Sequence, residues 1–292
     1  MISTDFKIHL QQELIELSLL DSAIESVRKL TGGSVNQSYE LTGSNTSFFL
    51  KVNDLTSYPN MFEKEVGGLN LLRRSSFIEV PEVLIQGSYE KLAFLVLEFV
   101  PNSDPNQGYW EFFGKGLATL HQNTSEQFGL SYNNYNGSLH QMNHYTDDWG
   151  SFFIENRLTE QQRQARDNGR LSKELSKMLD LLYPKLSSFF PEEKPALLHG
   201  DLWSGNFMVK QGNPCYMDPS VYYGHREVDL AMSLLFGGFD KRMYEAYHEI
   251  FPLEKDWEKR VDVFNLYPLM VHVNLFGTSY AQRVKSILKN YI

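Results

Sequence analysis

A short polar stretch near residue 200 carries side chains that could do chemistry. From Leu197 to Val209 the sequence reads LLHGDLWSGNFMV, so that His199, Asp201 and Asn206 lie within eight residues. Apolar runs of the kind that form short strands flank them on both sides. Polar side chains held between two strands form either a turn or a site, so this stretch is the first candidate for a functional site.

Three kinds of structure fit this stretch. A hydrolase metal site is one, since histidine and aspartate two positions apart can both ligate a metal, but Asp218, His225 and Asp229 offer further ligands only loosely. A plain turn is another, with Asp201 and Asn206 as local caps. The third is a phosphoryl-transfer site, which needs a carboxylate beside the attacking hydroxyl and a neutral oxygen ligand for Mg²⁺ a short loop away.

The spacing of the polar residues favours phosphoryl transfer. Asp201 and Asn206 are five positions apart, as are the aspartate and asparagine of the kinase catalytic loop, H-R-D-x-x-x-x-N. Downstream, PCYMDPS places Asp218 at the end of a predicted strand, where kinases carry an aspartate that binds Mg²⁺. Together these residues predict a site that uses ATP and Mg²⁺.

A lysine and a glutamate far from this stretch strengthen the pattern. Lys51 lies on a third predicted strand, SFFLKV, after a turn that contains two glycines. In the predicted helix MFEKEVGGLNLLRR, at about 100° per residue, Glu65 falls within the apolar arc and Glu63 does not. A carboxylate on a buried helix face needs a cationic partner. Lys51 is the expected partner, and the pair would aim the lysine at the phosphates of ATP.

The elements that must position these residues change in character along the chain. The proline- and glycine-containing segment PNSDPNQG separates a strand-rich part from a mostly helical part, and we expect an ordered loop over 131–145. The sequence predicts an α+β fold of two lobes, a small sheet lobe over 1–100 and a larger, mainly helical lobe over 101–292. Strands are predicted at 26–30, 38–41, 47–52, 80–88 and 92–100. Helices are predicted at 5–20, 61–74, 109–122, 147–158, 173–186 and in the region after 228.

Composition bounds the class of protein. The 292 residues are 42% hydrophobic, enough for a sizeable core. A net charge of -9 argues against a nucleic-acid-binding protein, which needs a basic face. Cys215 is the only cysteine, which favours a reducing compartment. The longest apolar run, LAFLVLEFV, is too short to cross a membrane and contains Glu98. We expect a soluble cytoplasmic protein that binds no membrane, and a monomer, since nothing demands a dimer.

At this point the sequence resembles the fructosamine kinase (ketosamine-3-kinase) family, which has a protein-kinase-like fold related to the aminoglycoside phosphotransferases. The resemblance rests on HGDLWSGN and DPSVYYGHREVDLAMSLLFGGF, and GGSVNQSYEL, FFLKVN, MFEKEVGGL, VPEVL, FLVLEFV and NLYPLMVHVNLFG also fit. It implies an antiparallel sheet lobe with one key helix. It also implies ATP-dependent phosphorylation of the C3 hydroxyl of ketosamines, which are sugars joined to amines by glycation. The unstable product would then release the amine.

The resemblance also implies roles for single residues. The glycine loop here is GGSVNQS rather than G-x-G-x-x-G, and it lacks the cysteine that some members carry. The tryptophan of HGDLWSGN could stack on the sugar or pack in the core. The implied roles are Asp201 as catalytic base, Asn206 and Asp218 as Mg²⁺ ligands, Lys51 with Glu65, Gly33 and Ser34 at the phosphates, Glu98 to Val100 as the adenine hinge, and Trp203 at the substrate.

The sequence leaves two competing functions and the identity of the substrate open, and it suggests structural roles for three further residues. A kinase of another hydroxyl substrate, such as an aminoglycoside, and a non-catalytic nucleotide-binding protein are the competing functions. The substrate could be a fructosamine, ribulosamine or erythrulosamine, free or attached to a protein. We expect His199 to brace the catalytic loop, Asp229 to hold its backbone, and His121 to be a core residue. Asp201 needs no unusual pKa, since an ordinary aspartate is ionised at neutral pH.

Overall fold

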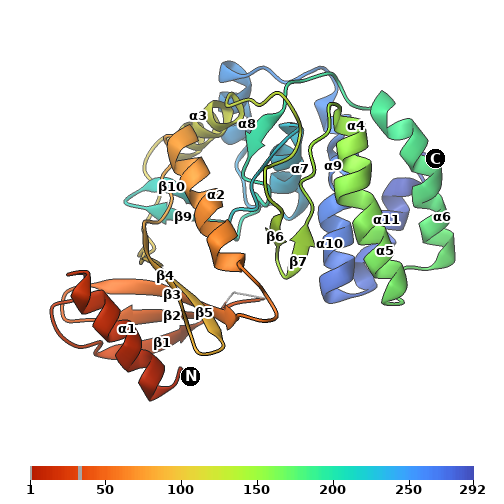
Figure 1. Ribbon diagram of the computed structural model, residues 1–292. Coiled ribbons are helices and arrows are strands. Elements are labelled where there is room, and N and C mark those ends of the chain that lie inside the picture. The colour runs from red at the N-terminus through yellow and green to blue at the C-terminus, as the bar shows by residue number, and fades with distance from the viewer. Residues whose placement is uncertain (1, 32–34) are drawn as a thin grey trace.

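The structure, a computed structural model, describes residues 2–31 and 35–292. Its first part is an antiparallel five-stranded sheet in the order β1-β2-β3-β5-β4, with one helix packed on each face (Figure 1). Its elements are α1 (Thr4–Glu16), β1 (Ser26–Leu30), β2 (Gln37–Thr42), β3 (Ser47–Asp54), α2 (Met61–Ser75), β4 (Val83–Tyr89) and β5 (Leu92–Glu98).

Alternation along the strands assigns the two faces of this sheet. On β5, Phe94 and Val96 pack with Leu10 of α1 in one hydrophobic cluster. Leu95 and Leu97, one position out of step, face the other way and belong to the larger cluster that includes residues of α2 and of the helical part. All four β5 side chains are buried because both faces of the strand are covered. The inner face of the sheet therefore faces the rest of the molecule.

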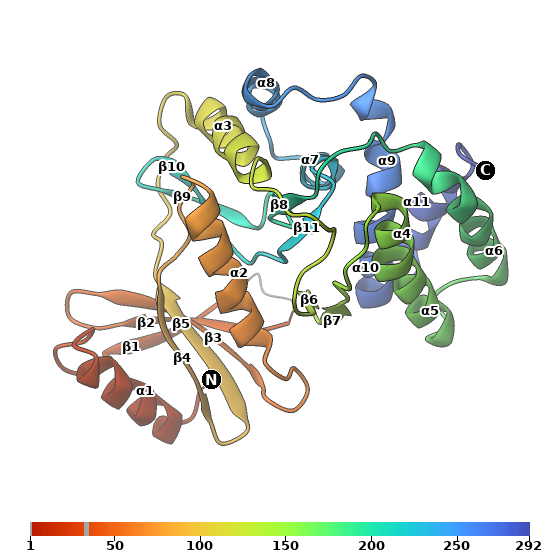
Figure 2. The same ribbon diagram turned by 45° about the horizontal axis from the view of Figure 1, so that its top comes forward.

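Beyond residue 100 the chain is mainly helical, with short two-stranded sheets between the helices (Figure 2). The first of its elements are α3 (Tyr109–His121), β6 (Asn134–Asn136), β7 (Leu139–Gln141), α4 (Trp149–Phe152), η1 (Phe153–Thr159), α5 (Glu160–Asp167), α6 (Lys173–Leu182) and η2 (Tyr183–Ser188). The remaining elements are β8 (Ala196–Leu198), β9 (Phe207–Lys210), β10 (Asn213–Tyr216), β11 (Tyr222–Gly224), α7 (Glu227–Leu235), α8 (Lys241–Ile250), η3 (Trp257–Lys259), α9 (Val261–Phe264), α10 (Leu266–Phe276) and α11 (Ser279–Leu288).

Two small sheets frame the polar stretch near residue 200. β8 pairs with β11, and the β9–β10 hairpin lies between them in the chain, so the segment from Gly200 to Asn206 joins β8 of one pair to β9 of the other. Gly200 has a positive φ of 82°, and a Cβ at this position would lie 2.0 Å from the backbone oxygen of Ser220. Glycine is required there because any larger residue would both strain the backbone and collide with the backbone of Ser220.

The α+β class and the split between a sheet part and a helical part are confirmed. The expectation of an ordered loop over 131–145 is wrong for its middle part, where residues 134–141 form the β6–β7 hairpin. Its strands have three residues each, too few for an alternating pattern to stand out in the sequence. Side chains hold the hairpin instead: Nε2 of Gln141 donates to Asn134 at 2.8 Å and to the hydroxyl of Ser220 at 2.9 Å. Among the described residues, no helix is long and apolar enough to cross a membrane.

Candidate active site

Lys51 is the buried centre of a cleft between the sheet and the helical part. It lies on β3 opposite Leu95, so its side chain is on the inner face of the sheet. Its Nζ lies 2.6 Å from Oε1 of Glu65 on α2 and 2.5 Å from Oδ1 of Asp218 after β10. Burial alone would lower the pKa of Lys51, but Asp218 and Glu65 outweigh that effect and raise it. The predicted Lys51–Glu65 ion pair is therefore present, whereas its use in orienting ATP stays a prediction.

Asp201 and Asn206 face each other across the loop that follows β8. Nδ2 of Asn206 donates to the backbone oxygen of Asp201 at 2.9 Å and to its Oδ2 at 2.7 Å. These bonds use the amide nitrogen of Asn206 and leave Oδ1, for which no donor lies within residues 2–31 and 35–292. Asp201, Asn206, Lys51, Glu65 and Asp218 all line one cleft. The structure thus brings together residues that are up to 167 positions apart.

A buried aspartate behind the loop fixes its backbone. The carboxylate of Asp229 on α7 accepts hydrogen bonds from the N–H of His199 at 2.7 Å and of Gly200 at 2.9 Å. His121, fully buried on α3, places Nε2 3.2 Å from the same carboxylate. The ring of His199 is in turn bonded to the backbone oxygen of Met217 at 3.0 Å. The predictions that His199 and Asp229 hold the loop, and that His121 is a core residue, are confirmed.

The pKa of Asp201 departs from the expectation. Loss of water around the carboxylate raises the pKa of Asp201 to about 7, against the hydrogen bond from Asn206, which lowers it. The residue still keeps some exposure to the cleft. The expectation of an ordinary pKa was therefore wrong, and its cause is packing around the loop, which a local sequence pattern does not reveal.

Asp218 fits the part of a metal ligand. Its φ of 47° lies in the left-handed region, which a residue other than glycine adopts at a cost and which is common at functional sites. One carboxylate oxygen meets Lys51, and the side chain is about half exposed to the cleft, at 49%. With Oδ1 of Asn206 it offers only oxygen ligands, the kind that Mg²⁺ prefers. The residues present therefore suit Mg²⁺, which they would bind together with phosphate oxygens.

Of the other residues predicted to bind the nucleotide, the structure describes Glu98 and Val100. At the end of β5 the N–H of Glu98 donates to the backbone oxygen of Glu82 at 2.8 Å, and its carboxylate lies 2.8 Å from Nζ of Lys210. For the N–H of Val100, no backbone acceptor lies within the described part of the chain. Val100 is buried, and neither it nor Glu98 is among the residues that line the cleft with Lys51 and Asp201. Gly33 and Ser34 lie outside the described residues.

Several residues of the cleft were not singled out in the sequence. Trp203 was predicted at the substrate, with packing in the core as the alternative. It is one-third exposed and lines the cleft, which excludes the core alternative. The polar and aromatic character of 131–145 was a signal for the β6–β7 part of the lining, and the histidine within NLYPLMVHVNLF was a signal for α10. The lining residues missed are Val35, Asn36, Ser38, Met61, Lys64, Asn134, Tyr135, Asn136, Gly137, Pro219, Val271, His272, Leu275 and Phe276.

Comparison with known proteins decides the family. A family model described as fructosamine kinase matches residues 8–292. The chain belongs to the fructosamine kinase family. It is 40% identical over 289 residues to a protein of Enterococcus faecium assigned as a ketoamine kinase, covering 97% of this chain and 99% of the relative. It is 34% identical to a protein-ribulosamine 3-kinase of Arabidopsis thaliana, covering 92% of this chain and 83% of the relative.

Solved structures agree with this fructosamine kinase family and with its kinase-like fold. A protein of Haemophilus somnus assigned as a fructosamine-3-kinase matches with a TM-score of 0.85 and 28% identity, over 97% of this chain and 96% of the other. An aminoglycoside phosphotransferase bound to ADP and hygromycin B matches with a TM-score of 0.63 and 15% identity, over 98% of both chains. The second likeness shows the fold alone. The chain is an enzyme of the ketosamine kinase class, and the aminoglycoside and non-catalytic alternatives are not favoured.

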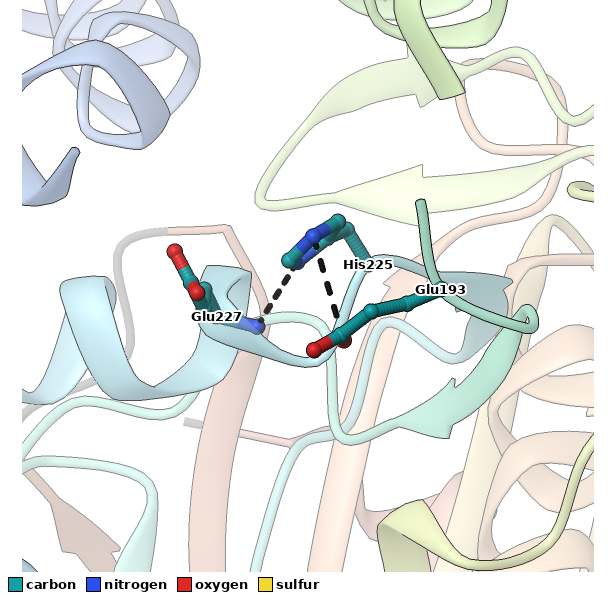
Figure 3. Close-up of side chains that lie close together, drawn as sticks. All are labelled: Glu193, His225 and Glu227. Atoms are coloured by element: carbon teal, nitrogen blue, oxygen red, sulfur yellow. Dashed lines mark hydrogen bonds and ion pairs between the residues drawn. The ribbon is translucent and has the colours of Figure 1, made fainter. Parts of the chain in front are cut away.

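A second acidic group in this member of the fructosamine kinase family is not an active site. Glu193, His225 and Glu227 place possible ligand atoms within 4.8 Å of one another (Figure 3). Each carboxylate already has a cationic partner: Arg226 binds both oxygens of Glu193, and Arg260 binds both oxygens of Glu227. In Figure 3 the bond between His225 and Glu227 involves the backbone nitrogen of Glu227. The group is therefore a buried ion-pair network.

Breaking this network should destabilise the fold. Arg260→Ala leaves the carboxylate of Glu227, which is almost fully buried, without its partner, and such a loss costs about 3–5 kcal/mol. Lys259→Ala is the matched control, since its ion pair with Asp256 is exposed and is worth less than about 1 kcal/mol. Urea denaturation measures both free energies of unfolding. Equal losses in the two variants would contradict a structural role for the network.

Acid should weaken the fold through His225. Burial, and next the charges of Arg226 and Arg260, lower its pKa to about 3, whereas the unfolded chain titrates near about 6.5. Between these values the unfolded chain binds a proton that the folded chain does not. The free energy of unfolding should therefore fall as pH drops below about 6.5, by roughly 1 kcal/mol per pH unit. In His225→Asn, which cannot titrate, urea denaturation should show a shallower fall over this range, and an unchanged slope would argue against this assignment.

Proposed function

We propose that this enzyme transfers the γ-phosphoryl group of ATP to the C3 hydroxyl of a ketosamine. The bond between the γ-phosphorus and the bridging oxygen of the β-phosphate breaks, a bond from phosphorus to the C3 oxygen forms, and ADP leaves. One observation carries the proposal: Lys51, Glu65, Asp218, Asn206 and Asp201 line a single cleft in a chain of the fructosamine kinase family.

Each of these residues has a part in the proposed reaction. Lys51, held by Glu65, donates to phosphate oxygens and neutralises their charge. Asp201 orients the C3 hydroxyl and accepts its proton late, because the transition state is loose and little proton transfer is needed before it. Asn206 and Asp218 would hold Mg²⁺, which would neutralise charge on the phosphates. The N–H of Val100 and the backbone near Glu98 would receive the adenine.

The substrate is proposed to be a glycation adduct, and the product to release its amine. A ribulosamine kinase and a fructosamine-3-kinase assignment among the similar proteins support sugars of five and six carbons as the first candidates. We place the reaction in the cytoplasm, where the lone Cys215, which is buried, stays reduced. The acidic composition supports a small-molecule or protein-linked ketosamine as substrate rather than a nucleic acid.

Release of ADP from a substrate panel tests the proposal. The purified protein is incubated with ATP and Mg²⁺ and with fructose-lysine, ribulose-lysine, erythrulose-lysine or kanamycin. Turnover on a ketosamine supports the proposal, and the sugar with the highest kcat/KM identifies the preferred substrate. Turnover on kanamycin alone, or on none of the panel, overturns it.

A further inference from the structure

Aromatic side chains form a connected surface at the cleft: Trp203, His272 and Phe276 line the cleft, and Phe236 and Tyr280 extend the surface beyond its lining. The ring of His272 on α10 lies 5.0 Å from Phe236, 5.3 Å from Phe276 and 4.9 Å from Tyr280. Phe236, just after α7, lies 6.0 Å from Trp203 of the catalytic loop. We call these five side chains the aromatic wall. It joins three helices and the loop that carries Asp201.

The aromatic wall is open to solvent at the catalytic cleft. Phe276 is 52% exposed, Phe236 38% and Trp203 36%. Large apolar side chains in one continuous exposed patch commonly mark a binding surface. Trp203, His272 and Phe276 line the same cleft as Asp201. A ligand whose hydroxyl is at Asp201 therefore has the wall beside it.

His272 adds one hydrogen-bond acceptor to the wall. Its Nδ1 lies 2.7 Å from the backbone oxygen of Pro268, and because a carbonyl can only accept, Nδ1 carries the hydrogen. Burial lowers the pKa of His272, which keeps the ring neutral and its Nε2 an acceptor. Nε2 has no donor among the described residues and is not fully enclosed, so it is available to a ligand.

Few carboxylates line the described part of the cleft. Among the described residues that line the cleft, the acids are Glu65, Asp201 and Asp218, and both Glu65 and Asp218 are bound to Lys51. The aromatic wall itself has no carboxylate. A single ammonium group can be met by ring faces and one neutral acceptor, whereas several ammonium groups need several carboxylates.

We propose that the aromatic wall binds the amine half of the substrate: the secondary ammonium of a ketosamine lies against its ring faces and donates a hydrogen bond to Nε2 of His272. This deepens the proposed function and rests on it. The sugar half then lies at Asp201, and the hydrocarbon of the amine extends along Phe276. The wall selects a substrate with one ammonium group and an attached hydrocarbon over a polyamine.

Two variants separate the parts of the wall. Phe276→Ala removes an exposed ring, and His272→Phe keeps a ring but removes the acceptor Nε2. Phe77→Ala is the matched control, because Phe77 is 47% exposed, packs 4.9 Å from Phe112, and is not part of the cleft lining. Steady-state kinetics with fructose-lysine should give a KM about tenfold higher in both wall variants. The kcat and the KM for ATP should stay within about twofold, since the contact is made equally before and during reaction. The control should match the wild type.

An uncharged analogue tests the role of the ammonium group. The analogue is 1-acetamido-1-deoxyfructose, whose nitrogen carries no charge. The wild-type KM for this analogue should be as high as the KM of the wall variants for fructose-lysine, and Phe276→Ala should raise it no further. A wild-type enzyme that phosphorylates fructose-lysine while both wall variants keep its KM would overturn the wall assignment and leave the proposed function standing. Equal losses for the charged and uncharged sugars would also overturn it. A wild type that phosphorylates no ketosamine would instead overturn the proposed function.

Discussion

Asp201→Asn should lower kcat by a factor of about 10² to 10⁴ while ATP still binds. Asparagine keeps the shape of the side chain and an oxygen that can accept the hydrogen bond from Asn206, so the loop should keep its conformation. It cannot accept the proton of the C3 hydroxyl, and it carries no charge to orient that hydroxyl. Single-turnover measurement of phosphoryl transfer, together with titration of an ATP analogue, separates loss of chemistry from loss of binding.

The same chemical change at an exposed site is the control for this prediction. Asp147 is exposed, accepts a hydrogen bond from Gln127, and is not among the residues that line the cleft. Asp147→Asn should therefore leave kcat unchanged. An Asp201→Asn enzyme with wild-type turnover would remove Asp201 from the mechanism, because no other unpaired carboxylate among the described residues lines the cleft.

The parts of the site that the sequence predicts well are those with a local signal. The spacing of Asp201 and Asn206 reflects a loop whose two side chains bond to each other, so distance along the chain and distance in space agree. Glu65 stood out because a carboxylate on an apolar helix face needs a partner, and that partner is Lys51. In both cases a single physical requirement is visible within a few residues.

The aromatic wall could not be predicted in this way, because its members come from separate segments. The segment NLYPLMVHVNLF is mostly apolar, as expected of a core helix, and α10 is buried along most of its length. His272 and Phe276 are four positions apart and share one helix face, and that face is open only because α10 borders the cleft. Whether a helix face meets protein or solvent depends on the packing of other elements, which periodicity does not specify.

The sheet part and the helical part are separate in chain order, but their side chains share one hydrophobic cluster. α2 belongs to the sheet part in sequence, yet Phe62, Leu69 and Leu72 join the same hydrophobic cluster as Leu198 and Leu230 of the helical part. Tyr135 at the β6–β7 hairpin also donates to the backbone oxygen of Pro59, just before α2. These contacts fix the helix that carries Glu65 relative to the loop that carries Asp201. A domain boundary near residue 100 therefore stays a prediction. The ion pair of Lys51 with Glu65 is held in place by contacts from both the sheet part and the helical part.

Lys51→Met should lower kcat by a factor of about 10² to 10³, the size of effect seen when one charged stabiliser of a transition state is lost. Methionine has a similar length but no charge, so it leaves Glu65 and Asp218 facing each other without the cation that joins them. The transferring phosphoryl group would lose a donor, and the two carboxylates would repel each other. Lys285→Met is the control for the chemical change, since Lys285 forms an exposed pair with Glu174 at 2.8 Å outside the cleft lining, and its kcat should not change.

Glu65→Gln distinguishes a positioning role from a direct one. If Glu65 acts only by holding Lys51, the glutamine variant should lose less activity than Lys51→Met, and the double variant should be no worse than Lys51→Met alone. The comparison needs kcat for all four enzymes, with ADP release at saturating ATP. Losses that multiply in the double variant would mean that Glu65 acts independently of the lysine. Non-additive losses would instead mean that Glu65 on α2 acts on the phosphates of ATP through Lys51. We expect this result, because Lys51 is buried and its ammonium group is bound to Glu65.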